Sequence, residues 1–130
     1  MIQEDYISFE TAKLLKEKGF DEATIGYYNT ISEIPEKIKF FDSPISIYDS
    51  DGLIGCIQAP TLQMAMKWLR EVHSIDISID IRFWTDDEGV DVKSWRYTVY
   101  RTDEIEDFGQ SDTYEDACEE AIKYCLENLV

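Results

Sequence analysis

The sequence has little of what most catalytic and metal sites need. It contains one histidine, His73, and three cysteines, and no two cysteines stand in the Cys-x-x-Cys spacing of common zinc and redox sites. The motifs of nucleophile elbows, P-loops, dinucleotide-binding folds, zincins and deaminases are also missing. The sequence therefore predicts a protein that is not an enzyme and holds no cofactor or metal. An active site assembled from dispersed residues stays open as an alternative.

Basic residues are scarce. The chain has 12 Lys and Arg against 28 Asp and Glu, for a net charge of −16. Direct binding of nucleic acid or of an anionic membrane needs a positive surface, so neither is expected. Three interpretations of the acidity remain: solubility alone, a basic protein partner, or mimicry of a polyanion.

Long apolar runs are absent as well. No run approaches the roughly 20 residues that a membrane-spanning helix needs. The first residues lack the basic and apolar regions of a secretory signal, so the cytoplasm is the expected compartment. The 130 residues, 44% of them apolar, fit one domain with a hydrophobic core.

Residues 59–83 give the strongest structural signal. Pro60 and Thr61 suit a helix start, and apolar residues then recur three and four apart up to His73. The period changes near Ser74, after which isoleucine alternates with polar residues as far as Phe83. Such alternation predicts a strand with one buried and one wet face, as in antiparallel sheets. We expect the isoleucines and Phe83 to be buried beneath the helices that start near Thr61 and Thr113.

The rest of the chain predicts further helices and strands. The Asp51-Gly52 pair suits a hairpin turn, and Thr113 suits a helix cap. The expected segments are a helix over 7–19, a strand over 23–29, an unassigned stretch over 30–41, a hairpin over 43–58, a strand over 92–101, an acidic connector over 103–112 and a helix over 113–129. The fold class is therefore α+β, in the order α-β-(β-β)-α-β-β-α. We expect one antiparallel sheet of about four to five strands, with the helices packed on one face.

The wet face of this sheet is the predicted interaction surface. It would carry charged and aromatic side chains from two neighbouring strands: Asp76, Asp80, Arg82, Trp84, Arg96 and Tyr100. Tyr28 and Tyr124 are further candidates for surface aromatics, which are enriched at interfaces. The alternative is that some of these rings lie in the core.

Other possible sites have simpler explanations. Asp49, Asp51 and Gly52 match part of a calcium loop, but the later ligands are missing. His73 ends a helix, where a structural role is expected. Cys118 and Cys125 fall on the apolar side of their helix, so we predict buried, unpaired thiols, as for Cys56.

Residues 7–20, 59–73 and 113–129 resemble segments of a family of small, uncharacterised acidic proteins. Bacteriophages, prophages and mobile elements of gut bacteria encode these proteins. The resemblance implies an accessory protein of a mobile element, and it implies no activity and no residue roles. The leading hypothesis is a small cytosolic protein that binds a host or phage protein, with a basic partner favoured by the charge. The alternative is a small-ligand-binding protein or enzyme with a dispersed site on the open sheet face.

Overall fold

The computed structural model describes residues 2–46 and 55–130. In these residues the chain forms helices and strands in the order α1 (Phe9–Glu17), β1 (Thr24–Asn29), β2 (Lys39–Ile45), β3 (Cys56–Ala59), α2 (Leu62–His73), β4 (Ile75–Thr85), β5 (Asp91–Arg101), β6 (Glu104–Ser111) and α3 (Tyr114–Asn128). The α+β class is confirmed. The strands form two separate three-stranded antiparallel sheets, so the prediction of one sheet of four to five strands is wrong.

The chain divides into two compact units, one of Met1–Ala65 with Val130 and one of Met66–Leu129. We call them the first and the second unit and describe each by itself. The boundary falls inside α2, which begins where Thr61 Oγ1 accepts a hydrogen bond from the backbone N–H of Met64 at 3.1 Å. The predicted single domain stays a prediction.

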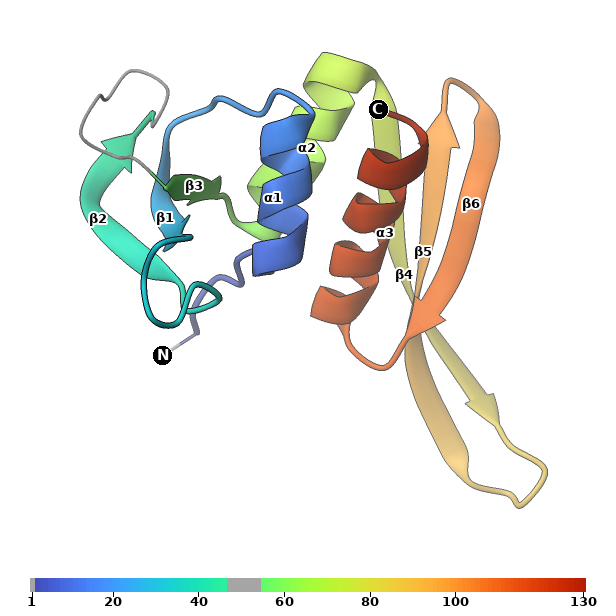
Figure 1. The fold of residues 1–130 in the computed structure, drawn as a ribbon. Helices are drawn as coiled ribbons and strands as arrows, with labels where there is room; N and C mark the ends of the chain where they lie inside the picture. Colours follow the sequence, from blue (N-terminus) through green and yellow to red (C-terminus); the bar gives the residue numbers. More distant parts are fainter. Residues whose placement is uncertain (1, 47–54) are drawn as a thin grey trace. The chain divides into compact units, whose positions relative to one another are not determined.

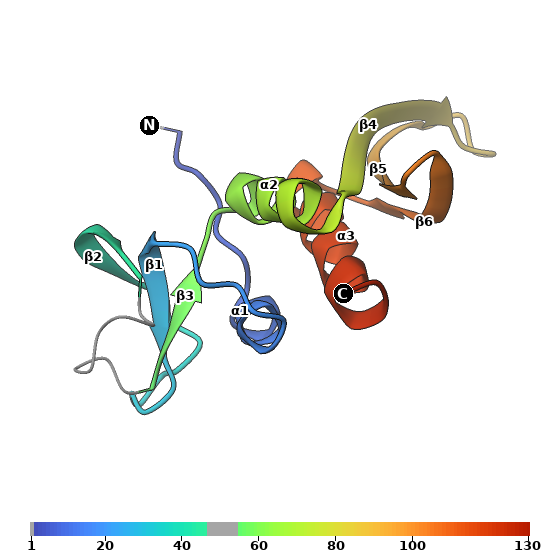
Figure 2. The ribbon, with the colours of Figure 1, turned by 90° about the horizontal axis from the view of Figure 1, so that it is seen from above.

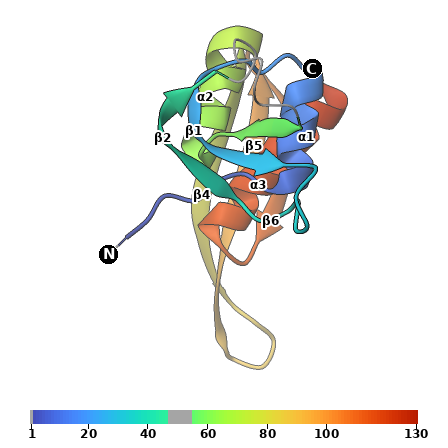
Figure 3. The same ribbon diagram turned by 60° about the vertical axis from the view of Figure 1, so that its left-hand side comes forward.

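In the first unit, β1 is the central strand and lies between β2 and β3 (Figure 3). Half of the predicted hairpin over 43–58 lies outside the described residues, and its described ends, in β2 and β3, pair with β1. A turn signal reverses the chain but does not decide which strands pair. The expected turn residues, Asp49–Gly52, lie outside the described residues. In the unassigned stretch, turns occupy residues 30–37, and β2 begins at Lys39.

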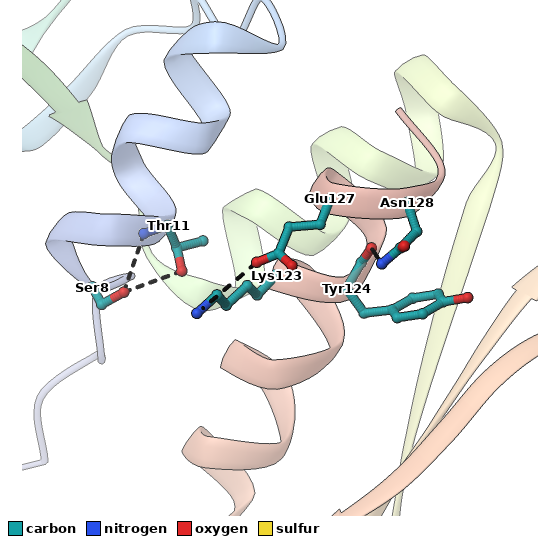
Figure 4. A network of polar contacts seen from close by, with 6 residues as sticks. All are labelled: Ser8, Thr11, Lys123, Tyr124, Glu127 and Asn128. Carbon is teal, nitrogen blue, oxygen red and sulfur yellow. Dashed lines mark hydrogen bonds and ion pairs between the residues drawn. The ribbon is translucent and has the colours of Figure 1, made fainter.

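The α1 helix of the first unit has a cap residue at each end. Ser8 Oγ accepts a hydrogen bond from the backbone N–H of Thr11 at 3.2 Å, which satisfies a donor that the first helical turn leaves free (Figure 4). Gly19 follows the helix with a φ of 92°, a conformation that glycine adopts without steric cost. Phe20 comes next and is buried.

In the second unit, the strands lie in the order β4-β5-β6, and α3 packs against one face of the sheet (Figures 1 and 2). The α3 helix begins at the predicted cap, because Thr113 Oγ1 accepts from the N–H of Asp116 at 3.0 Å. Lys123 and Glu127 form an exposed ion pair farther along this helix (Figure 4). The apolar side of α3 is fully buried and contains Ala117, Cys118, Ala121, Ile122, Cys125 and Leu126.

The isoleucine strand is confirmed, but its burial is only partly as predicted. Ile75 is fully buried, whereas Ile81 is 40% and Phe83 71% exposed. The 15 residues of α3 span about 22 Å, while the 11-residue strands β4 and β5 span about 36 Å. The helix is therefore too short to cover the whole β4–β5 hairpin, whose tip extends beyond it (Figure 1). The predicted packing of α2 on this face stays a prediction.

The acidic segment predicted as a connector is the strand β6. It pairs with β5 from Arg101↔Glu104 to Trp95↔Ser111, with a bulge near Val99 and Tyr100. The order of elements therefore gains a strand before α3. Because α3 packs on β5 and β6 as well as on β4, β6 belongs to the sheet that this helix covers.

Candidate functional site

The register between β4 and β5 places all six predicted site residues on one face of the second unit's sheet. Residues directly opposite one another in an antiparallel pair project from the same face. Asp80 stands opposite Arg96 and Asp76 opposite Tyr100, while Arg82 and Trp84 stand opposite Ser94 and Val92. This face is the one that α3 does not cover, because the buried Ile75 and Val99 project from the other one. We call it the open face.

The sequence analysis missed two residues of the open face, both on β6. Phe108 stands opposite Thr98, and Ile105 stands opposite Tyr100. Phe108 is 68% and Ile105 61% exposed, more than Trp84 at 43%. In a regular strand, residues three apart project from opposite faces, so the sequence pattern did not predict that these two share one. The bulge in β6 brings them to the same face.

The predicted surface aromatics have different environments. Trp84 is exposed, and Tyr100 and Tyr124 are partly exposed. Tyr28, in contrast, is a core residue of the first unit, 5% exposed, and its hydroxyl donates to the backbone carbonyl of Ile7 at 2.7 Å. Of the two possibilities that the sequence left open for Tyr28, surface and core, the core is the one observed, because its side of β1 packs inward.

Two buried polar atoms lie on the open face. Among the described residues, Ser94 Oγ and Arg96 Nε have no hydrogen-bond partner although both atoms are buried. Ser94 is 5% exposed as a residue. It occupies the central strand beside Arg96 and opposite Arg82, so longer side chains surround it. A buried hydroxyl without a partner costs free energy, which makes this position a place where an acceptor group would be stabilised.

Charge is unevenly distributed along the second unit. Met66–Leu129 contains 17 acidic and 7 basic residues. Five of the acids fall in residues 103–112, where no basic residue occurs. Three of these acids, Glu104, Glu106 and Asp107, fall in the first half of the edge strand β6, where Ile105 lies between them and Phe108 follows them.

The turn between β4 and β5 contains a second group of acidic residues, Asp86, Asp87 and Glu88. Asp86 Oδ1 accepts hydrogen bonds from the backbone N–H groups of Glu88 and Val90, each at 2.9 Å. Asp86 is thus a turn residue that orders the backbone. Beside it, an open hollow of about 550 Å³ is lined by Phe83, Trp84, Thr85, Asp91, Val92 and Lys93. Trp84 is the one predicted site residue among these lining residues.

The cysteines and the histidine have structural surroundings. All three thiols are free and buried, and burial raises the pKa of Cys118 to about 11 and that of Cys125 to about 12. Such thiols hold little thiolate at neutral pH and are poor nucleophiles. The His73 ring packs edge-on against Trp68, with ring centroids 4.7 Å apart.

Within residues 2–46 and 55–130, no three His, Cys, Asp or Glu side chains gather in a way that could hold a metal ion. The partial calcium loop at Asp49–Gly52 lies outside these residues. Nor is any helix in the described part of the chain long and apolar enough to cross a membrane. No protein-family model, curated protein or solved structure matches this chain.

Proposed function

We propose that this protein is a small, acidic, non-enzymatic accessory protein of phage or mobile-element origin that binds a basic host or phage protein in the cytoplasm. The binding surface is the open face of the second unit. One observation carries the proposal: Trp84, Ile105 and Phe108 expose large apolar side chains on that face, from both edge strands of one sheet. Ile105 and Phe108 are neighbours there, while Trp84 lies about 20 Å farther along the sheet, because its partner Val92 is six residues from Thr98, the partner of Phe108. Large apolar side chains exposed on one surface are typical of protein interaction sites.

Charge supports a basic partner. The aromatic and apolar residues of the open face lie beside Asp76, Asp80 and the acidic strand β6. A basic protein would be attracted by this surface before contact, and the apolar side chains would then be buried against it. The resemblance of the helices to proteins of mobile elements supports the proposed origin.

The test compares capture of proteins from a bacterial lysate by the wild type and by a Trp84→Ser, Phe108→Ser variant. We expect the wild type to retain specific basic proteins at about 0.05 M salt and to release them near 0.5 M, where charge is screened within a few ångströms. The variant should retain much less. Ile34→Ser removes an apolar side chain of intermediate exposure, 54% against 43% for Trp84 and 68% for Phe108, from the first unit and serves as the control. Equal capture by the variant, or capture indifferent to salt, would contradict the proposal.

A second candidate is a small-ligand or enzyme site on the same face. The buried Ser94 Oγ and Arg96 Nε without partners favour it, since a ligand carrying a carboxylate or phosphate could accept hydrogen bonds from both. Titration with inorganic phosphate, followed by NMR of the β5 amides, tests this candidate. Saturable shifts that disappear in Ser94→Ala and Arg96→Gln would support it, and shifts that do not saturate would count against it.

A further inference from the structure

No strand among the described residues pairs with the outer edge of β4. In the part of the chain that the structure describes, β5 is the strand paired with β4, and β4 ends the sheet order β4-β5-β6. From Asp80 to Thr85 every residue of the strand is exposed, and this half of β4 projects beyond α3 (Figure 1). Ile81 and Phe83 lie here with 40% and 71% of their surfaces open. Long, exposed edges with apolar side chains readily pair with another strand.

The charges of this segment identify which strand would fit. Residues 77–85 contain one acidic residue, Asp80, and one basic residue, Arg82, in a chain whose net charge is −16. The segment is therefore locally neutral, and a second copy can approach it without local repulsion. The β6 edge differs, because Glu104, Glu106 and Asp107 would face the same carboxylates of another copy.

We propose that β4 pairs with β4 of a second copy, antiparallel and centred on Ile81, to form a homodimer with a continuous six-stranded sheet. In this register Ile81 faces Ile81, and Ile79 faces Phe83. Asp80 of each copy stands opposite Arg82 of the other, so the two-fold axis produces two cross-strand ion pairs. The exposed Phe83 gains an apolar neighbour, and the backbone edge gains hydrogen-bond partners.

Charge distinguishes this register from its neighbours. Pairing centred on Asp80 places this aspartate opposite its own copy, and pairing centred on Arg82 places two arginines opposite each other. Both registers are disfavoured by repulsion between like charges. Pairing centred on Ile79 opposes Asp76 with Arg82 but leaves Asp80 opposite Ser78. The Ile81 register alone of these four opposes Asp80 with Arg82, and it uses the exposed half of the strand. Edge pairing also leaves the open face uncovered, so the inference is independent of the proposed function.

The first test uses charge reversal and sedimentation equilibrium at about 0.15 M salt. The wild type should move from 15.2 kDa to twice that mass as its concentration rises. Asp80→Arg and Arg82→Asp should each weaken the dimer by about tenfold or more, because each sets like charges opposite one another. The double variant Asp80→Arg, Arg82→Asp should recover most of the loss, since it exchanges the two members of each pair.

Matched controls separate this effect from net charge. Asp87→Arg makes the same charge change as Asp80→Arg, but in the exposed turn. Lys37→Asp makes the same charge change as Arg82→Asp, but at an exposed residue of the first unit. Both should dimerise like the wild type. A monomer at every concentration, growth beyond a dimer, or a double variant no tighter than the single ones would overturn the proposal.

A cross-linking experiment tests the register. Directly opposed residues of antiparallel strands have Cα atoms about 4.5 to 5.5 Å apart, within disulfide reach. Ile81→Cys should therefore form an intermolecular disulfide under mild oxidation. Phe83→Cys should not, because the two copies of residue 83 would lie about 13 Å apart. The three native cysteines are buried and contribute no background. Cross-linking through residue 83, or none through residue 81, would overturn the register.

Discussion

The hydroxyl of Tyr97 in β5 donates a hydrogen bond to a carboxylate oxygen of Asp107 in β6, 2.9 Å away. Gly109 is the cross-strand partner of Tyr97, and a Cβ atom built on Gly109 would lie 2.5 Å from ring atom Cε2 of Tyr97. The ring therefore lies against the backbone of Gly109 on its way to Asp107. The acidic strand β6 is held in the sheet by this packing as well as by its backbone pairing.

The first prediction concerns Gly109. Gly109→Ala should lower the free energy of unfolding by about 1 to 3 kcal/mol, because the buried Tyr97 ring must move to admit the new methyl group. Urea denaturation measures the change. In a Tyr97→Leu background the same substitution should cost much less, and an equal cost in both backgrounds would show that the ring is not the obstacle. Gln110→Ala, at the exposed neighbouring residue, should be nearly neutral.

The second prediction concerns pH. Burial, and then the hydrogen bond and negative charge of Asp107, raise the pKa of Tyr97 above its ordinary value. The folded state thus keeps a proton that the unfolded chain loses above about pH 10, and the tyrosine's contribution to stability falls as pH rises past that value. Wild-type stability should decline by up to about 1.4 kcal/mol more per pH unit than that of Tyr97→Phe above about pH 10.

Near neutral pH the wild type should be the more stable of the two proteins. Tyr97→Phe should there be about 1 kcal/mol less stable than the wild type, because it loses the hydrogen bond to Asp107. The gap should therefore narrow in alkaline buffer. A constant difference between the two proteins from pH 8 to pH 11 would contradict the raised pKa.

The β6 strand shows why part of the fold could not be predicted. Two residues, Thr102 and Asp103, join the paired residues Arg101 and Glu104. Thr102 has a φ of 58°, a conformation that Asn or Gly normally supplies in such tight turns. The usual sequence signal of a hairpin was therefore absent. Acidic residues are also rare in strands, and the pairing with β5 overrides that preference.

The isoleucine strand shows what local patterns do fix. Alternation predicted β4 and its two faces, and the register with β5 places Asp80 opposite Arg96. The pattern contains no information on how far a covering helix extends, so Phe83 was assigned to the core. The six predicted site residues share one face because successive side chains of a strand project alternately from the two faces of the sheet. Ile105 and Phe108 were missed because a bulge changes the period of β6.

The third prediction follows from this graded burial. Ile75→Ala should cost about 2 to 5 kcal/mol in unfolding free energy, as expected for a fully buried aliphatic side chain. Ile81→Ala, on the same face of the same strand, should cost less than about 1 kcal/mol, because 40% of that side chain is already exposed. Thermal and urea denaturation of the monomer at low concentration would compare them. Equal losses would mean that Ile81 is covered in solution.

The last prediction uses the buried thiols to test whether the chain unfolds as one domain. Burial raises the pKa of all three cysteines, and Cys56 lies in the first unit while Cys118 and Cys125 lie in the second. A native thiol should thus react with an alkylating reagent at pH 8 mainly through unfolding. Pulsed alkylation across a urea series, read by peptide mass spectrometry, follows each site separately.

If the single-domain prediction is right, the three thiols become reactive at the same urea concentration, because one cooperative transition exposes them together. Labelling of the fully unfolded chain supplies the intrinsic rate of each thiol as the control. Reactivity of Cys56 at a clearly lower urea concentration than Cys118 and Cys125 would show that the first unit unfolds by itself. The boundary inside α2 would then separate two folding units. The continuous α2 helix would not be enough to make the two cores unfold together.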